Sequence, residues 1–222
     1  KRKRSRCPKC NHVLGLFDLI PILSFIFQKG RCRYCSKNIP LHHLFTELAA
    51  VFLAFLIIMF SPKPLDYNFF FNFIFLEILL ALTLTDIKFQ TLPDIFVGML
   101  GVAGIAKVLF FSESFLVSAL LGLVVGIVIL GAFAFFSKGR AMGWGDVKLA
   151  GAMGIILGAG QVFFAILLAF VLGGIVGAVL MIGKKVTPKS KIAFGPFLTV
   201  ATAVFILFPS LYEQILFFYG LM

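Results

Sequence analysis

All four cysteines of the chain lie near its N-terminus, in two pairs with identical spacing. Two residues separate Cys7 from Cys10, two separate Cys32 from Cys35, and 21 residues lie between the pairs. Two thiolates at this spacing can bind one ion, and a second pair completes a closed tetrahedral zinc site. Four sulfur ligands leave no open coordination position, so we expect a structural zinc ion. The alternatives are two disulfides or free thiols.

Only nine residues of the chain are acidic, and two of these lie where apolar runs meet polar loops. Asp86 ends one run and Asp146 opens another. Two carboxylates that converge from different helices can share a proton, so that one acts as a base toward water and the other as an acid. Gly143 and Gly145 leave room beside Asp146 for an extended peptide backbone. The alternative is that Asp146 is an ordinary N-cap and Asp86 an ordinary helix terminus.

Three further ionisable residues, Glu47, Glu77 and Lys107, lie inside apolar runs. Ionisable groups at membrane depth are costly and are candidates for function by default. Together with the two aspartates they leave two other functions open. One is a transporter that relays protons or binds a cation, and the other is a non-catalytic assembly factor.

The elements that carry these residues have the composition of membrane helices. Of the 222 residues, 61% are hydrophobic and 13% are charged, whereas soluble domains carry about 25% charged residues. Apolar runs near the ~20 residues needed to span a bilayer lie at 41–60, 69–85, 94–111, 115–136, 147–159, 161–183 and 192–209. We therefore predict an all-α polytopic membrane protein with about seven membrane helices in residues 41–222. Residues 1–40 should form a small zinc-ribbon-like domain.

The positive charges predict the orientation of these helices. The net charge is +11, and ten of the 20 Lys and Arg residues lie in residues 1–40. Basic segments beside membrane helices favour the cytoplasmic side, where they face anionic lipid. This predicts that the cysteine segment and the loops 86–93, 137–146 and 184–191 are cytoplasmic, with both aspartates at the cytoplasmic membrane boundary. Because the remaining charge lies in short loops between apolar runs, we expect a lipid bilayer and not a nucleic acid as its partner; the alternative is a basic nucleic-acid domain in residues 1–40.

At these residues the sequence resembles the type IV prepilin leader peptidases. Residues 143–146, Gly-Trp-Gly-Asp, are similar to the GxGD motif of that family, and the residues that follow favour its prepilin-peptidase version. Asp86, followed by Lys88 and Asp94, is similar to the first aspartate segment of the family. The cysteine-bearing segments resemble its cytoplasmic domain, and residues 194–198 resemble its last-helix motif. The resemblance therefore covers nearly the whole chain, in order.

The resemblance implies that Asp86 and Asp146 are the catalytic pair of an intramembrane aspartyl endopeptidase. It also implies supporting roles beside the substrate for Lys88, Asp94, Gly143, Gly145 and Lys148. The implied substrates are prepilins or pseudopilins, cut at the cytoplasmic face of the bacterial inner membrane without a catalytic metal. Many members also N-methylate the new amino terminus, which makes S-adenosylmethionine a candidate cofactor. The sequence does not identify residues that would bind it.

Family members usually begin with a membrane helix before the cysteine segment, whereas this chain begins with basic residues and no Met. We therefore expect an eighth, N-terminal helix to be missing from the sequence. The oligomeric state is not indicated by any pattern in the chain.

Overall fold

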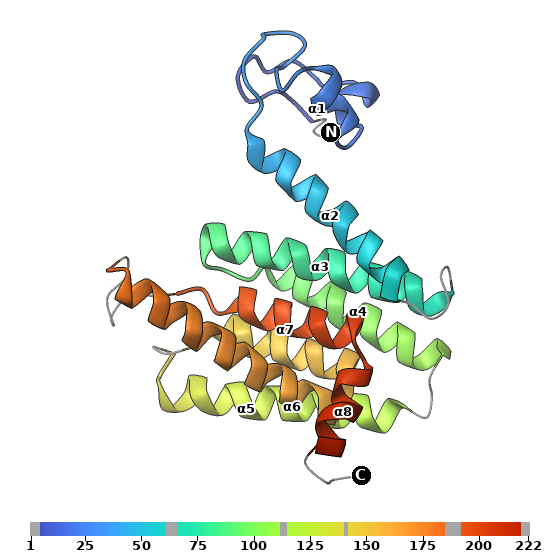
Figure 1. Ribbon diagram of the computed structural model, residues 1–222, viewed down its shortest axis with the longest axis vertical. Helices are drawn as coiled ribbons and strands as arrows, with labels where there is room; N and C mark the ends of the chain where they lie inside the picture. The colour runs from blue at the N-terminus through green and yellow to red at the C-terminus, as the bar shows by residue number, and fades with distance from the viewer. Residues whose placement is uncertain (1–4, 61–65, 112–114, 140–141, 185–191, 219–222) are drawn as a thin grey trace. The chain divides into compact units, whose positions relative to one another are not determined.

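The computed structural model describes residues 5–60, 66–111, 115–139, 142–184 and 192–218 (Figure 1). Within these ranges the secondary structure is helical and no strand is formed, so the predicted all-α class is confirmed. Contacts divide the chain into two compact units, Lys1–Leu56 and Ile57–Met222, and each is described by itself. Most of the predicted loop 184–191 and residues 140–141 of the loop 137–146 lie outside the described residues. The predicted boundary after residue 40 stays a prediction.

The N-terminal unit contains two turns with the same backbone pattern, one for each cysteine pair. An antiparallel bridge closes each turn, joining Arg6 to Val13 and Arg31 to Asn38. Between the turns lie the 3-10 helix η1 (Leu16–Leu19) and the short helix α1 (Leu23–Phe27). Helix α2 (Leu41–Phe60) follows the second turn. So few apolar residues are buried here that a segment of this size needs a cross-link or a metal to fold.

The second unit is a bundle of helices arranged around α6. Its elements are α3 (Tyr67–Phe89), α4 (Asp94–Phe111), α5 (Leu116–Phe136), α6 (Trp144–Ile182), α7 (Gly195–Leu207) and α8 (Ser210–Phe218). Helix α6 packs against α5, α7 and α4, while α3 packs against α7 and α4. Helix α7 therefore lies between α3 and α6, the two helices that carry the candidate aspartates (Figure 1).

Glycines bring the backbones of α5 and α6 into direct contact. A β-carbon on Gly122 would lie 2.2 Å from the carbonyl oxygen of Gly154, and one on Gly126 would lie 2.3 Å from that of Ala150. No side chain fits at such a distance, which is why small residues allow membrane helices to approach closely. This contact fixes the first half of α6, the half that carries Asp146.

Helix α6 is kinked where the sequence predicts a break. Gly158 leaves helical geometry, with φ 77° and ψ 174°, a conformation that glycine adopts without steric cost. The oxygen of Ser118 and the ring of Phe115 occupy the space where a β-carbon would lie. The predicted runs 147–159 and 161–183 are thus two parts of one kinked helix.

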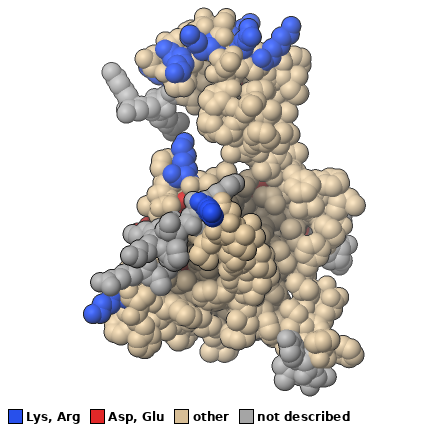
Figure 2. All heavy atoms as spheres, turned by 60° about the vertical axis from the view of Figure 1, so that its left-hand side comes forward, with Lys and Arg blue, Asp and Glu red and all other residues tan. Residues whose placement is uncertain are grey.

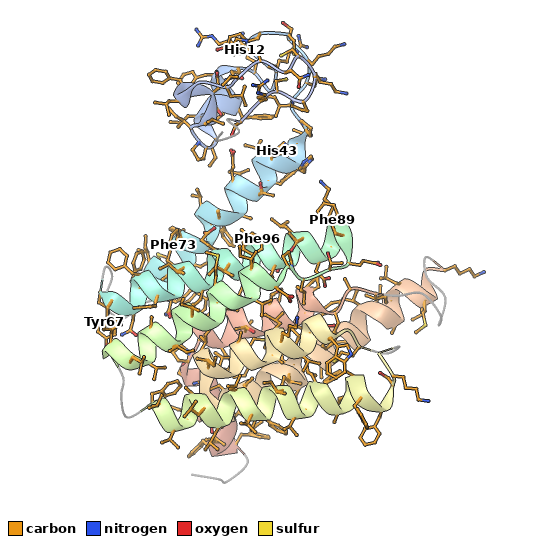
Figure 3. All side chains as sticks on the ribbon, turned by 180° about the vertical axis from the view of Figure 1, so that it is seen from behind. His12, His43, Tyr67, Phe73, Phe89 and Phe96 are labelled. Atoms are coloured by element: carbon orange, nitrogen blue, oxygen red, sulfur yellow. The ribbon has the colours of Figure 1, made fainter. Side chains whose placement is uncertain are left out.

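Several helices are suited to a membrane. Among the described residues, α2, α3, α5 and α6 are long and apolar enough to cross one, and the pair α7–α8, bent by 93°, would make a fifth span. Large apolar side chains project from the outside of the bundle (Figure 3), including Phe110, Phe136 and Ile182. Contiguous apolar surface of this kind suits lipid and not water. The prediction of a multi-pass membrane protein is confirmed, and the number of seven crossings stays a prediction.

Candidate active site and metal centre

Asp86 lies in the last turn of α3, where it is buried although the residues that follow it, up to the end of the helix, are exposed. Tyr67 and Phe89 mark the two ends of this helix in Figure 3, and Asp86 is close to the Phe89 end. Its Oδ2 accepts a hydrogen bond of 3.0 Å from the backbone N–H of Gly195. The first N–H groups of a helix have no partner within that helix, so the start of α7 supplies a donor that holds this carboxylate in place.

Gly195 allows the close approach of α7 to Asp86. A β-carbon on residue 195 would lie 2.5 Å from Asp86 Oδ2, so any other amino acid would displace the Asp86 carboxylate or the start of α7. Sequence reasoning included Gly195 only as part of a motif and missed its role as a donor. The signal available was a glycine followed by Pro196, because proline is favoured in the first turn of a helix.

Asp146 lies in the first turn of α6 and is also buried. Its Oδ2 accepts a hydrogen bond of 3.2 Å from the backbone N–H of Gly143. Gly143 is the N-cap and Asp146 the third helical residue, so this is the side-chain half of a capping box. The alternative that Asp146 is itself the N-cap is therefore wrong.

The two aspartates line one cavity of about 290 Å³. The other residues lining it are Gln90, Thr91, Leu92, Asp94, Gly143, Gly145 and Lys148. Asp86 and Asp146 are buried, while Gln90 and Gly143 are exposed, so the carboxylates lie at the base and polar groups form the rim. The fold therefore brings two carboxylates from different helices, α3 and α6, to the lining of one cavity.

Lys148 and Asp94 form an ion pair at the rim of this cavity. Lys148 Nζ lies 2.8 Å from Asp94 Oδ1, and both side chains are solvent-exposed. Exposed pairs contribute only about 0–1 kcal/mol, so this one is more relevant to the charge at the entrance than to stability. It links the first residue of α4 to the first turns of α6.

Two other residues differ from the sequence expectation. Lys88 does not line the cavity; its Nζ lies 5.3 Å from the centroid of the Phe89 ring, and its supporting role stays a prediction. Leu92, which sequence reasoning missed, lies against the glycines beside both aspartates. A β-carbon on Gly145 would lie 3.3 Å from Leu92 Cβ, and one on Gly195 3.2 Å from Leu92 Cδ2. Leu92 thus forms an apolar wall of the site.

The other embedded ionisable residues have surroundings of their own. In the N-terminal unit, Glu47 Oε2 accepts from the N–H of Ile22 at 2.7 Å. In the second unit, Lys107 Nζ donates to Asn72 Oδ1 at 3.3 Å, and Glu77 Oε1 is buried and has no hydrogen-bond partner among the described residues. Neither Lys107 nor Glu77 lines the aspartate cavity.

The four cysteines form a compact cluster in the N-terminal unit. Their sulfurs lie within 4.8 Å of one another, and Cys7 Sγ is 3.9 Å from Cys35 Sγ. Thiolates about 2.3 Å from one tetrahedral ion are separated by about 3.8 Å, close to this distance. The four thiols are free, so the alternative of two disulfides is not what the structure contains. The cluster can hold a metal ion.

The environment of the thiols also fits a cation. The backbone N–H groups of Cys10 and Lys9 lower the pKa of the Cys7 thiol to about 6. At Cys35 the N–H of Lys37 acts in the same direction, but burial and hydrogen bonds with the other three thiols outweigh it and raise the pKa to about 11. Cys7 is therefore favoured as a thiolate, whereas Cys35 is favoured as a neutral thiol. A divalent cation would hold all four sulfurs deprotonated.

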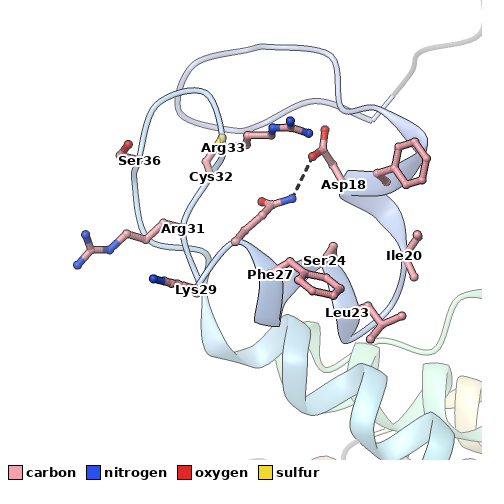
Figure 4. Close-up of a pocket in the computed structure, with 12 residues that line it drawn as sticks. Asp18, Ile20, Leu23, Ser24, Phe27, Lys29, Arg31, Cys32, Arg33 and Ser36 are labelled. Atoms are coloured by element: carbon pink, nitrogen blue, oxygen red, sulfur yellow. Dashed lines mark hydrogen bonds between the residues drawn. The ribbon is translucent and has the colours of Figure 1, made fainter.

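A second cavity, of about 870 Å³, lies in the same unit (Figure 4). Asp18 lines it and accepts hydrogen bonds from Gln28 Nε2 and the N–H of Gly15, each at 3.0 Å. The aromatic rings of Phe17 and Phe27 and the guanidinium groups of Arg31 and Arg33 also line it. Figure 2 shows that Lys and Arg side chains gather over this unit. The cavity is within the size range of small-molecule sites, about 300–1,000 Å³, and combines an acid, basic groups and aromatic surface.

The chain is similar to two family models. The model described as the type IV leader peptidase family matches residues 73–178, and that described as the bacterial peptidase A24 N-terminal domain matches residues 1–61. The first match contains both candidate aspartates, and the second contains all four cysteines.

The chain is also similar over most of its length to curated proteins named prepilin leader peptidase/N-methyltransferase. That of Bacillus subtilis (strain 168) is 30% identical over 195 residues, which cover 87% of this chain and 77% of the relative. That of Aeromonas salmonicida (strain A449) is 31% identical over 202 residues, covering 89% and 69%. That of Burkholderia pseudomallei (strain K96243) is 31% identical over 210 residues, covering 92% and 67%. No solved structure gives a significant match.

Proposed function

Because the chain belongs to the type IV leader peptidase family, we propose that it is an aspartyl endopeptidase that removes the leader peptide of prepilins or pseudopilins. The observation that carries the proposal is that Asp86 and Asp146 reach the base of one cavity from different helices. Each is held by the N–H of a glycine. The comparisons contain no transporter, which was the main alternative.

The reaction follows from the two carboxylates. One carboxylate takes a proton from a water molecule while the oxygen of that water attacks the scissile carbonyl carbon. The other carboxyl group, which is protonated, donates its proton to the carbonyl oxygen. As the C–N bond breaks, the first carboxyl group gives the water proton to the leaving nitrogen, and a hydroxyl of the tetrahedral intermediate returns a proton to the second carboxylate, giving a new carboxyl group and a free amine. Both glycine N–H groups bond to Oδ2, which leaves the Oδ1 atoms of the pair for water and substrate.

The cavity suits a peptide backbone in an extended conformation. Gly143 and Gly145 line it without side chains, and Leu92 offers an apolar contact opposite Gly145. We propose that the peptide enters beside Gly143, between the Lys148–Asp94 pair and the segment Gln90–Leu92. The supporting roles of Asp94, Gly143, Gly145 and Lys148 then consist of shaping and charging this entrance.

We further propose that the site faces the cytoplasm at the inner membrane of a bacterium. Lys88 lies in the last turn of α3 and Lys148 near the start of α6, and the loop before α6 contains Lys138 and Arg140, as expected for cytoplasmic ends of membrane helices. In that orientation the carboxylates lie at the depth where a membrane-anchored substrate leaves the bilayer.

For the cysteine cluster we propose a structural zinc ion bound by Cys7, Cys10, Cys32 and Cys35. The sulfur distances and the two matching turns support this assignment. Four thiolates complete the coordination sphere, so the ion would stabilise the unit and would take no part in cleavage.

The cavity of the N-terminal unit favours a second activity, N-methylation of the new amino terminus. S-adenosylmethionine would supply the methyl group. The chemistry of the donor set fits this molecule: Asp18 can accept from ribose hydroxyls, Arg31 and Arg33 can bind its carboxylate, and Phe17 and Phe27 offer surface for the adenine. Equilibrium binding of labelled S-adenosylmethionine to the parent and to Asp18→Ala tests this assignment.

The peptidase proposal is tested by cleavage of a model prepilin in detergent micelles. We expect the parent chain to cleave and the folded variants Asp86→Asn and Asp146→Asn to be inactive, because Asn keeps the size of the side chain but cannot exchange the proton. Glu213→Gln, which changes an exposed acid on α8, should cleave like the parent. Parental activity in either aspartate variant would remove that residue from the catalytic pair.

A further inference from the structure

A pair of threonine hydroxyls joins α3 to α7 about one helical turn from the contact between Asp86 and Gly195. Thr83 lies three residues before Asp86, and Thr199 lies four residues after Gly195. Thr83 Oγ1 and Thr199 Oγ1 are 2.6 Å apart, and Thr199 is only 1% exposed. A hydrogen bond to a buried hydroxyl such as that of Thr199 is stronger than the same bond at a surface, because the local dielectric constant is lower.

The hydroxyls also connect to the backbone of their own helices. Thr83 Oγ1 lies 2.8 Å from the carbonyl oxygen of Leu79. Thr199 Oγ1 lies 3.1 Å from the carbonyl oxygen of Gly195 and 2.9 Å from that of Pro196. Each hydroxyl has one proton and can accept as well, so Thr83 can donate to Thr199 while Thr199 donates to the first turn of α7. The pair thus ties that first turn directly to α3.

The position of Gly195 relative to Asp86 depends on how α7 is placed against α3. Its N–H bonds to Asp86 at 3.0 Å, and the missing β-carbon leaves no space to spare. Both helices, which pack against one another, also bury apolar residues, among them Leu82 of α3 and Leu198 of α7. Apolar packing is not directional, so it does not by itself prevent α7 from rotating or sliding. A hydrogen bond between the helices does.

We infer that Thr83 and Thr199 are positioning residues for the proposed peptidase: their hydroxyl pair sets the position of α7 on α3, so that the N–H of Gly195 meets Asp86. This inference rests on the proposed function. Neither threonine lines the cavity, so neither touches the substrate. They act through Gly195.

The chain offers a matched control on the same helix. Thr202 is also fully buried, and its Oγ1 lies 2.8 Å from the carbonyl oxygen of Leu198, within α7. Thr202→Val therefore removes a buried hydroxyl with a bond to its own helix, as Thr199→Val does, but no bond to α3. Thr199→Ser keeps the hydroxyl and removes only a methyl group.

The experiment measures thermal unfolding, kcat, KM and the pH–rate profile of prepilin cleavage for the parent, Thr199→Val, Thr199→Ser, Thr83→Val and Thr202→Val. We expect Thr199→Val and Thr83→Val to lose at least tenfold in kcat with little change in KM, and to show a displaced pH–rate profile. Thr199→Ser should stay within about twofold of the parent, and Thr202→Val should keep the parental profile. The double variant Thr83→Val/Thr199→Val should be no worse than either single one, because coupled residues are not additive.

The other charged groups around Asp86 are Asp146 and Lys148 of α6 and Asp94 of α4, and none of them is changed in these variants. A parental pH–rate profile in folded Thr199→Val, or an equal displacement in Thr202→Val, would overturn the inference while leaving the peptidase intact. If Thr199→Val does not fold, the kcat and pH–rate profile of Thr83→Val test the inference instead, because Thr83→Val leaves the hydrogen bonds within α7 in place. Cleavage retained by Asp86→Asn would instead overturn the proposed function, and the positioning role with it.

Discussion

The N–H of Gly195 lies 3.0 Å from Asp86 Oδ2, although 109 residues separate them in the chain. This bond makes the start of α7 part of the candidate active site. It also explains why α7 must lie between α3 and α6, since from there it supplies a donor to one aspartate while packing against the helix that carries the other.

The first prediction concerns Gly195→Ala. The added methyl group would lie 2.5 Å from Asp86 Oδ2, so α7 or Asp86 must move and the hydrogen bond is lost. Loss of one donor from an oxyanion hole costs about 10²–10³ in kcat; because the Gly195 N–H bonds to a proposed catalytic carboxylate and not to the substrate, we expect a loss up to this size in prepilin cleavage. Gly174→Ala is the control, because a β-carbon there meets nothing within 4 Å. Equal activity in the two variants would show that the Gly195 contact is unimportant.

A second prediction concerns the dependence of cleavage on pH. The pair needs one proton between its two carboxylates. Below the lower apparent pKa both are protonated and no base remains; above the upper one both are ionised and no acid remains. We therefore expect a bell-shaped plot of kcat against pH, measured with a peptide substrate over the range in which the protein stays folded. A flat profile would contradict the two-carboxylate mechanism.

The sequence predicted the parts of the site that depend on local spacing. The two Cys-x-x-Cys pairs can be read from four positions, and the hydropathy of runs such as 41–60 and 115–136 matches α2 and α5 closely. The depth of Asp86 and Asp146 at the cytoplasmic membrane boundary, inferred from the charges of the loops, stays a prediction. These features depend on residues near one another in the chain, or on the contrast between lipid and water.

The sequence did not predict the contacts that depend on how helices pack. The bond from Gly195 to Asp86, the wall formed by Leu92 and the pairing of Thr83 with Thr199 each join distant segments. Hydrophobic periodicity is weak in helices that are apolar on all sides, as membrane helices are, so it does not indicate which face meets which. Lys88 shows the same limit, because its place in the motif did not reveal that it lies outside the cavity.

The third prediction concerns the glycine contact between α5 and α6. In Gly122→Ala the new β-carbon would lie 2.2 Å from the carbonyl oxygen of Gly154, so the helices must separate. Overpacking of this kind typically costs about 1–3 kcal/mol, and we expect a lower midpoint of thermal unfolding in detergent together with reduced cleavage. Gly98→Ala, whose β-carbon would meet nothing within 4 Å, should unfold at the parental temperature or slightly above. An unchanged midpoint in Gly122→Ala would mean that this close approach does not contribute to stability.

The fourth prediction concerns the metal. We expect the purified chain to contain one zinc ion per molecule, measured by elemental analysis, and Cys10→Ser or Cys32→Ser to contain much less. Ser36→Ala, a change next to Cys35 that removes no sulfur, should keep the parental zinc content. Loss of the ion should speed hydrogen exchange in residues 5–39, because a structural zinc contributes folding free energy to the segment that binds it. Parental zinc content in both cysteine variants would exclude this cluster as the site.

The last prediction gives Glu47 a structural role. Ile22 has a positive φ of 62°, a costly conformation for a β-branched residue, and Glu47 Oε2 accepts its N–H at 2.7 Å. This carboxylate ties the start of α1 to the first turns of α2. In Glu47→Ala the N–H of Ile22 loses its partner, at a cost of about 1–3 kcal/mol. We expect faster hydrogen exchange in residues 20–30, and a smaller effect in Glu47→Gln, whose amide oxygen still accepts.

Thr46→Ala is the matched control, because the Thr46 hydroxyl bonds only within α2, to the carbonyl oxygen of His43 at 2.7 Å. If residues 20–30 show the same hydrogen exchange in Glu47→Ala and Thr46→Ala, at parental zinc content, the bond from Ile22 to Glu47 does not order α1. If Glu47→Ala instead abolishes proton or cation movement across vesicles that the parent supports, the embedded acids serve transport. We expect faster exchange in Glu47→Ala than in Thr46→Ala and no loss of ion movement, because the Glu47 carboxylate already accepts the N–H of Ile22.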